Sequence, residues 1–351
     1  MNRTMMAGTL ASALVAALAA GGALAQNAGL AGSAVPRGGD QSVRGYVLEA
    51  RDRSTKMTAE SATRIIGGRP AQEGAWPAQV SLHDAAVIDG TAEGMYKSQF
   101  CGGTLIARQW VLTAAHCLVD ENGNAADPRG LAVRTGSVDL TRGDLREVAR
   151  VIVHENYDTI RLEHDIALLQ LAQPVVDSSG PVGAIPVHGQ PDVPQGPAVV
   201  IGWGLTEEGQ GSDILLETDI DIVPNDTCNR GMLEDTKRSL GSMLVGMGVP
   251  NGIPEDKLEE AYAILVNNLG EALTGNMLCA GIASGQRTSC YGDSGGPLMV
   301  RQGDGNWLQV GIVSWGREPL GARQPCAHED LYSVYTRVGN YFDWIASHVR
   351  G

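Results

Sequence analysis

From Ile65 onward the chain is a succession of short apolar runs separated by Gly, Pro, Asn and Asp. The clearest runs span residues 79–82, 110–113, 151–153, 166–171, 199–203, 308–315 and 334–338. Many short strands at this spacing, with turn residues between them, are typical of an all-β barrel or sandwich. The chain has 351 residues, of which 43% are hydrophobic. That is enough for a large core, and we expect one globular unit made of two subdomains.

Two stretches have helical rather than strand periodicity. In residues 254–269 the apolar side chains recur at a spacing that places them on one face of a helix. They are Leu258, Ala261, Tyr262, Leu265 and Leu269. Pro254 lies at the start of this stretch and Gly270 just past its end, as expected for helix boundaries. A second helix is predicted near the C-terminus, over about residues 338–349.

The first 64 residues differ from the rest of the chain. Residues 1–25 combine Arg3, an Ala/Leu/Val stretch and a small-residue site before Gln26, which indicates a signal peptide for export. The apolar stretch is too short to predict a permanent membrane anchor. Residues 26–64 are rich in Gly, Ala, Ser, Arg and Asp without a sustained period, and we expect a flexible segment. The protein is therefore expected to be secreted or periplasmic.

An exported chain enters an oxidising compartment, where cysteines form disulfides. The chain has six: Cys101, Cys117, Cys228, Cys279, Cys290 and Cys326. No close pair of the C-x-x-C kind is present, which argues against zinc. Six cysteines allow 15 pairings, and their spacing alone does not select one.

The protein is acidic, with a formal net charge of −14. Seven of its 26 basic and four of its 40 acidic residues precede Ile65, which leaves 19 basic and 36 acidic residues after that point. Such a surface repels phosphate backbones and anionic headgroups. We expect no nucleic-acid partner and no membrane-surface partner.

Three short motifs contain the groups that amide hydrolysis requires. This reaction needs an activated nucleophile, a base, a group that orients the base and donors for the oxyanion. Ser294 lies in Gly-Asp-Ser-Gly-Gly-Pro, His116 in Thr-Ala-Ala-His-Cys and Asp165 in His-Asp-Ile-Ala-Leu-Leu. The glycines around Ser294 allow a tight turn that can direct the amides of Gly292 and Ser294 at one point.

At these motifs the chain resembles the chymotrypsin/trypsin family of serine proteases, whose triad occurs in the order His, Asp, Ser. Ile65-Ile66-Gly67-Gly68, Ser314-Trp315-Gly316 and the cysteine positions extend the resemblance over nearly all of residues 65–351. It implies a catalytic triad of His116, Asp165 and Ser294. It also implies two six-stranded antiparallel barrels, about 65–180 and 181–336, with a C-terminal helix.

The resemblance further selects three disulfides. They are Cys101 with Cys117, Cys228 with Cys279, and Cys290 with Cys326. Between Cys228 and Cys279 the chain is much longer than in typical relatives, which predicts a helical insertion in the second barrel. This insertion is either a lid over the outer substrate subsites or a helical decoration of the barrel.

Family members are made as inactive precursors, so the resemblance implies that residues 26–64 are a propeptide and activation segment. By this resemblance, cleavage after Arg64 frees the amine of Ile65, which turns inward and pairs with Asp293. A buried carboxylate without a partner is costly, so the nucleophile loop is expected to become ordered only when the amine arrives. An activating protease is then a possible partner.

The same correspondence makes Thr288 the floor of the primary pocket and assigns the small residues Gly316 and Ser333 to its walls. A neutral floor favours an uncharged aromatic or large aliphatic side chain before the scissile bond. Ser314, Trp315 and Gly316 are expected to offer a strand edge to the substrate backbone. Charged residues after Gly316, among them Arg317 and Glu318, are alternatives that could reach the pocket.

No cofactor and no required metal are expected, because Arg142 and Arg146 interrupt the acidic loop that binds calcium in some relatives. The other histidines of the chain do not lie in any recognisable motif.

The sequence predicts a monomeric serine endopeptidase acting on proteins or peptides. Two alternatives remain: the same enzyme with a trypsin-like preference for Arg or Lys and self-activation, and a non-catalytic binding module.

Overall fold

The computed structural model describes residues 43–53, 67–120, 123–176, 189, 194–206, 210–322 and 326–349. Their contacts form two compact units. The insertion unit contains Asn229–Ala272 and Pro319–Ala322, and the barrel unit contains the remaining described residues. The proposed signal peptide, residues 1–25, lies outside the described residues, as do Arg64 and Ile65.

The first barrel is a closed antiparallel sheet in the order β2-β3-β4-β7-β6-β5. Its interior is built from side chains with almost no exposure, among them Phe100, Leu112 and Ile166. The strands are β2 (Gln79–Asp84), β3 (Gln99–Ala107), β4 (Trp110–Thr113), β5 (Leu131–Thr135), β6 (Asp144–Val153) and β7 (Ala167–Leu171). Short elements in its loops are α3 (Ala92–Ser98), η1 (Ala115–Cys117) and η2 (Pro128–Gly130).

The second barrel closes in the order β8-β9-β10-β13-β12-β11, with β11 paired back to β8. Its strands are β8 (Gly196–Gly202), β9 (Leu216–Val223), β10 (Met277–Gly281), β11 (Pro297–Arg301), β12 (Trp307–Trp315) and β13 (Ser333–Arg337). Strand β9 shows why the sequence forms such a barrel, since its buried and more exposed side chains alternate strictly. The expectation of two six-stranded antiparallel barrels is confirmed.

Strand β1 (Arg69–Pro70) departs from the order expected from the sequence. It precedes every strand of the first barrel, yet it pairs with β9 of the second. The pairing places Arg69 beside Glu217 and Asp219, at 2.9 and 2.6 Å. The N-terminal end of the protease region, which the expected boundary at residue 180 assigned to the first barrel, therefore joins the second.

The C-terminal helix is also confirmed. A short turn η4 (Val338–Tyr341) leads into α6 (Phe342–Val349). Val338, Tyr341 and Ile345 are buried in the core of the first barrel. The chain thus leaves the second barrel through β13 and ends against the first, which joins the two halves.

The helical insertion is present and larger than the sequence indicated. The expected helix corresponds to α5 (Glu255–Asn267), but it is preceded by α4 (Asn225–Gly248) and η3 (Val249–Asn251). Within the insertion unit, a side chain at Gly248 would collide with Leu258, so the glycine allows α4 and α5 to approach closely.

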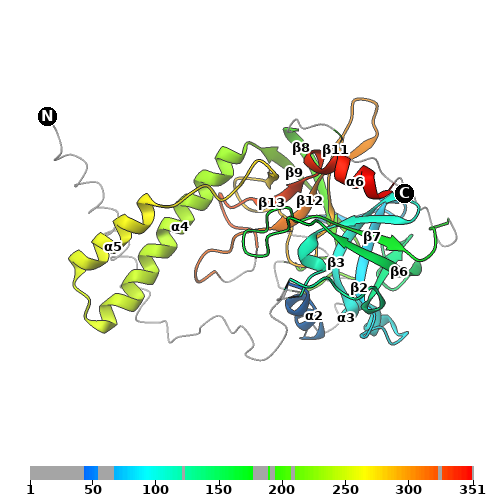
Figure 1. Ribbon diagram of the computed structural model, residues 1–351, viewed down its shortest axis with the longest axis horizontal. Coiled ribbons are helices and arrows are strands. Elements are labelled where there is room, and N and C mark those ends of the chain that lie inside the picture. The colour runs from blue at the N-terminus through cyan, green and yellow to red at the C-terminus, as the bar shows by residue number, and fades with distance from the viewer. Residues whose placement is uncertain are drawn as a thin grey trace. The chain divides into compact units, whose positions relative to one another are not determined.

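One expectation about the upstream segment was wrong. Residues 43–53, which the composition assigned to a flexible segment, form helix α2 (Val43–Arg53) in the barrel unit, beside α3 (Figure 1). The helix is short and mostly polar, so its periodicity is weak. It is stabilised by burial of Val47 and Arg51, both 0% exposed, against segments far along the chain. Tertiary packing of this kind leaves no local signal.

None of the helices among the described residues is long and apolar enough to cross a membrane.

Candidate active site

His116 and Asp165 are brought together by neighbouring strands of the first barrel. His116 lies in η1, directly after β4, and Asp165 lies just before β7, the strand that pairs with β4. The Nδ1 atom of His116 is 2.7 Å from Oδ2 of Asp165, and the backbone N–H of His116 donates to Oδ1 at 2.9 Å. The carboxylate therefore sets both the position of the imidazole and its tautomer.

The second barrel completes the surroundings of Asp165. Ser314 Oγ donates to Oδ2 at 2.5 Å, and Thr336 Oγ1 donates to the backbone carbonyl of Asp165 at 2.6 Å. The carboxylate is fully buried, and burial alone raises its pKa. The electrostatic interaction with His116 and the hydrogen bonds from His116 and Ser314 outweigh burial, so the pKa of Asp165 lies below its usual value. Asp165 is thus held as an anion.

Ser294 lies on a loop between β10 and β11 that is attached to both barrels. Its carbonyl accepts from Gly102 of β3 at 2.7 Å. On the other side, the N–H of Gly295 donates to Val313 of β12 at 2.8 Å. Gly292 and Gly295 have φ angles of +93° and +79°, a region that favours glycine. The sequence Gly-Asp-Ser-Gly can therefore make the sharp turn that the loop requires.

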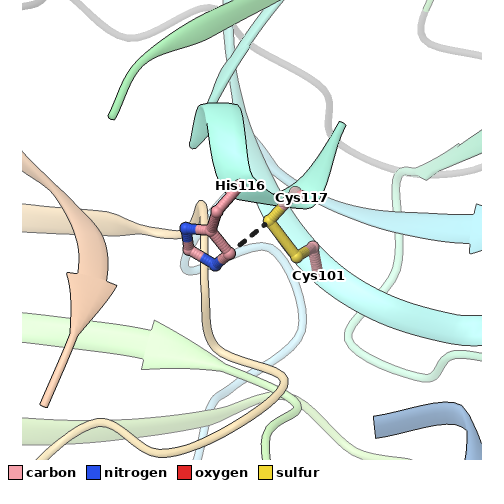
Figure 2. A group of neighbouring side chains, drawn as sticks. All are labelled: Cys101, His116 and Cys117. Atoms are coloured by element: carbon pink, nitrogen blue, oxygen red, sulfur yellow. Dashed lines mark hydrogen bonds between the residues drawn. A yellow bond between two sulfur atoms is a disulfide. The ribbon is translucent and has the colours of Figure 1, made fainter. Parts of the chain in front are cut away.

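Ser294 and His116 line the same cavity, of about 240 Å³. No hydrogen bond joins their side chains among the described residues. The Nε2 atom of His116 instead has a long contact of 3.8 Å with Sγ of Cys117 (Figure 2). The His116–Asp165 pair is in place, while the contact between His116 and Ser294 is still open.

Cys101, His116 and Cys117 form the cluster of metal-ligand residue types in Figure 2. The two sulfur atoms are bonded to each other in a disulfide. Metal ligation by cysteine requires a thiolate, so this cluster does not provide a metal site. The disulfide instead ties η1 to β3 and holds His116 in position.

All three pairings implied by the resemblance are present. They are Cys101–Cys117, Cys228–Cys279 and Cys290–Cys326. The third links the loop that contains Ser294 to the far wall of the cavity.

The amides of Gly292 and Ser294 are available for an oxyanion. Neither N–H donates to any group in the described part of the chain. Gln99, which the sequence analysis did not single out, donates through Nε2 to the carbonyl of Gly292 at 3.1 Å. This hydrogen bond holds the peptide group between Gly292 and Asp293, which lies between the two amides. No feature of the sequence distinguishes Gln99 from an ordinary core residue.

Asp293 points away from the cavity, into the interior. Its Oδ1 accepts from the N–H of Gly204 at 2.8 Å, and Oδ2 accepts from the N–H of Cys290 at 2.9 Å. Burial raises the pKa of Asp293 to about 6. No ion pair includes Asp293 among the residues that the structure describes, so this carboxylate has hydrogen bonds but no cation in direct contact.

The cavity contains the residues expected to select the substrate: Thr288, Ser314, Trp315, Gly316 and Ser333. Thr288 and Ser333 are buried and bonded to each other through their hydroxyl groups, at 2.5 Å. The cavity therefore has a neutral, hydroxyl-bearing wall. Arg317 and Glu318, left open as alternatives, also line it. Burial raises the pKa of the Glu318 carboxyl, while His328 opposes this shift.

The family model described as Trypsin matches residues 65–242 and 233–345. Among curated proteins, transmembrane protease serine 11C of Mus musculus is 34% identical over 286 residues, 81% of this chain and 53% of the relative. Transmembrane protease serine 7 of Homo sapiens is 34% identical over 297 residues, 82% of this chain and 28% of the relative. Serine proteinase stubble of Drosophila melanogaster is 32% identical over 300 residues, 83% of this chain and 32% of the relative.

The chain thus spans about half, or less, of the length of these curated relatives. The Trypsin family model, which matches residues 65–242 and 233–345, covers the region of the two barrels and of the cavity.

Proposed function

Because the chain belongs to the trypsin family of serine proteases, we propose that it is a serine endopeptidase with a triad of His116, Asp165 and Ser294. The observation that carries this proposal is the buried His116–Asp165 pair, bonded at 2.7 Å, in one cavity with Ser294. A non-catalytic module would have no need for an ionised carboxylate held behind a histidine at a serine-lined cavity.

The proposed reaction follows from the positions of these groups. His116 removes the proton of Ser294 Oγ, which attacks the substrate carbonyl carbon. The amides of Gly292 and Ser294 stabilise the negative charge that develops on the carbonyl oxygen. His116 then returns the proton to the leaving amine, and an acyl-enzyme remains. Water, activated by the same histidine, releases the acid and restores Ser294.

Maturation supplies a reason for the open contact between Ser294 and His116. We propose that cleavage after Arg64 frees the amine of Ile65, and that this cation pairs with Asp293. The buried position of Asp293 and its lack of a directly contacting cation support this step, since an ion pair would relieve the cost of its burial. Formation of the pair would draw the adjacent Ser294 loop into its catalytic arrangement.

For the substrate, we propose an uncharged aromatic or large aliphatic residue before the scissile bond. The neutral Thr288–Ser333 wall supports this preference. Glu318 is the observation that favours the alternative, because a carboxylate in the lining could attract Arg or Lys. A trypsin-like enzyme could then cut after its own Arg64.

The test is labelling and cleavage profiling of the matured protein. A serine-directed phosphonate should modify Ser294, and a mixed peptide pool should be cut after uncharged large residues. Absence of labelling in the correctly cut and folded protein would contradict the proposal. Incubation of purified wild-type and Ser294→Ala precursors separates the alternatives. If only the wild type matures, self-cleavage after Arg is favoured.

We also propose that the protein acts outside the cytoplasm, in the periplasm or the medium. Its three disulfides support this location, because such bonds persist in oxidising compartments. Fractionation of cells, with detection of mature protein in each fraction, tests it.

A further inference from the structure

Helix α2 precedes the proposed cut at Arg64, yet it is part of the barrel unit. It contacts β3 and α3, as well as η1, the turn that contains His116. Val47 and Arg51 have no exposed surface at all. A segment that maturation would separate from the protease is therefore bound next to the residues of the candidate site.

The polar anchor of this contact is Arg51. Its Nη2 donates to the carbonyl of Trp203 at 2.5 Å, and Nη1 to those of Tyr96 and Ser212 at 3.4 and 3.5 Å. The guanidinium also lies over the ring of Tyr96, 4.7 Å from its centre. A Cβ at Gly211 would be only 2.7 Å from the guanidinium carbon, so this glycine leaves space for the anchor. The barrel unit thus holds a shaped site for one arginine.

Arg51 remains a cation in this site at neutral pH. Burial lowers its pKa to about 10, which is still well above 7, and the neighbouring Tyr96, Asp293 and Asp213 oppose the effect of burial. Arg51 therefore places positive charge near Asp293 while α2 is bound, without an ion pair between the two.

Weaker contacts lie on both sides of the anchor. Arg44 pairs with Asp84 at 2.6 Å, and Asp52 pairs with Lys97 at 2.9 Å. These pairs are partly exposed, so they orient the helix more than they stabilise it. The Arg53 side chain, by contrast, is 64% exposed, and its ion pair among the described residues lies within the helix, with Glu49 at 3.8 Å. The binding of α2 to the barrel unit therefore depends on its buried face and not on its overall charge.

The other end of α2 covers the loop that contains Ser294. Val47 Cγ1 would lie 3.6 Å from a Cβ built at Gly292, one of the two proposed oxyanion donors. Tyr46 is in ring contact with Tyr291, with centroids 4.8 Å apart. Val43 lines the same cavity as His116 and Ser294. A polypeptide substrate crossing Ser294 would have to share this space with the helix.

We propose that α2 is an intramolecular inhibitor that occupies one side of the substrate groove and stays bound after cleavage at Arg64. The inference rests on the proposed proteolytic function. Cutting between residues 64 and 65 breaks one peptide bond and none of the contacts of α2. Residues 1–64 contain no cysteine, so none of these residues is tied to the protease by a disulfide. Full activity would therefore come in two steps, cleavage and then release of the fragment.

The experiment uses the full-length precursor, cut after Arg64 by an added protease, with the new Ile65 terminus verified by mass spectrometry. Gel filtration measures retention of the upstream fragment, and the rate of phosphonate labelling at Ser294 measures access to the groove. Arg51→Met keeps the apolar stem and removes the donors. Arg53→Met is the matched control, because its side chain is exposed and outside the contact.

We expect the wild-type fragment and the Arg53→Met fragment to co-elute with the protease, and labelling to be slow in both. In Arg51→Met the fragment should separate, and labelling should be at least tenfold faster. Adding an excess of a synthetic peptide of residues 38–56, with Arg51 intact, should slow the labelling of Arg51→Met again. This last measurement shows that the variant is folded and that its groove still accepts the helix.

Equal labelling rates in the wild type and Arg51→Met would overturn the inhibitory role, as would a peptide without effect on either protein. Labelling that fails in every cut protein, with the fragment removed, would instead contradict the proposed function. The two failures are therefore distinguishable.

Discussion

The carboxyl group of Asp293 lies against two backbone positions at which only glycine fits. A Cβ at Gly202 or Gly204 would collide with it, so the two glycines allow the burial of this acid. Its neighbours donate two amide hydrogen bonds, which compensate only part of the cost of removing a charge from water. A cation that approached the Asp293 carboxylate would therefore be bound favourably.

Replacing Asp293 by Asn should abolish activity without preventing folding. The amide cannot pair with the Ile65 amine, so the Ser294 loop and its oxyanion donors should stay misaligned, at a cost of about 100-fold or more in rate. Peptide hydrolysis after cleavage at Arg64 measures this. Asp304→Asn, at an exposed turn, is the control and should behave as the wild type. Full activity of Asp293→Asn would refute the role of the new terminus.

His83 gives a prediction about stability. It is fully buried between the hydroxyl groups of Ser81 and Ser98, each at 2.8 Å, and burial lowers its pKa to about 3, with Arg134 and Arg51 adding to the shift. In the unfolded chain it takes up a proton near pH 6.5. Below that pH only the unfolded state binds the proton, so stability should fall as pH drops from about 6.5 toward 3, by about 1.4 kcal/mol per pH unit.

His83→Gln keeps a polar partner for both serines and cannot be protonated. Urea denaturation at pH 7 and pH 5 should show that the variant loses about 2 kcal/mol less than the wild type over this interval. Parallel losses in the two proteins would mean that His83 is not the group responsible.

At the scale of elements, the insertion between Cys228 and Cys279 shows where periodicity is informative. Helix α5 was expected because its apolar residues recur regularly between a proline and a glycine. Helix α4 is not predicted by the sequence, because its 24 residues include several glycines and its apolar residues form only a weakly amphipathic pattern. Its formation depends on contacts such as that between Gly248 and Leu258, which join it to α5.

Deleting residues 232–272 should leave the barrels folded, because these residues lie in the insertion unit and the deletion retains Cys228 and Cys279. We expect hydrolysis of a short chromogenic substrate to change little, and the ratio of long to short peptide cleavage to shift about threefold or more if the insertion contacts the outer part of the substrate. A ratio equal to that of the wild type would show that the insertion is a helical decoration of the barrel without a role in substrate recognition.

At the scale of the molecule, the candidate site exists only where the two barrels meet. His116 and Asp165 come from the first barrel, and Ser294 comes from the second. Ser314 crosses this junction to donate to Asp165, and Gly102 crosses it to donate to Ser294. The alignment of the triad therefore depends on the packing of whole barrels.

Ser314→Ala tests this dependence. A buried carboxylate that loses one donor costs about 1–3 kcal/mol, so we expect kcat/KM of the matured enzyme to fall about tenfold. Ser347→Ala, on α6, removes an exposed hydroxyl of the same kind and should leave the rate unchanged. A rate for Ser314→Ala equal to that of the control would show that the hydrogen bond across the junction does not matter for catalysis.

The sequence by itself was sufficient for the all-β class and the C-terminal helix, and its resemblance to a known family added the two barrels, the three disulfides and the residues proposed as the triad. Short apolar runs, turn residues and motif spacing are local properties, and local properties can be read from a linear chain. The helix predicted at 254–269 belongs to the same group.

The tertiary structure decided the rest. It joined β1 to the second barrel, buried Asp293 without a contacting cation among the described residues, and placed Gln99, Ser314 and Thr336 behind the groups proposed as catalytic. It also folded α2 against the barrels. In most of these cases the contact joins segments more than 100 residues apart, as with Arg51 and the Trp203 carbonyl, and no pattern within either segment reveals its partner.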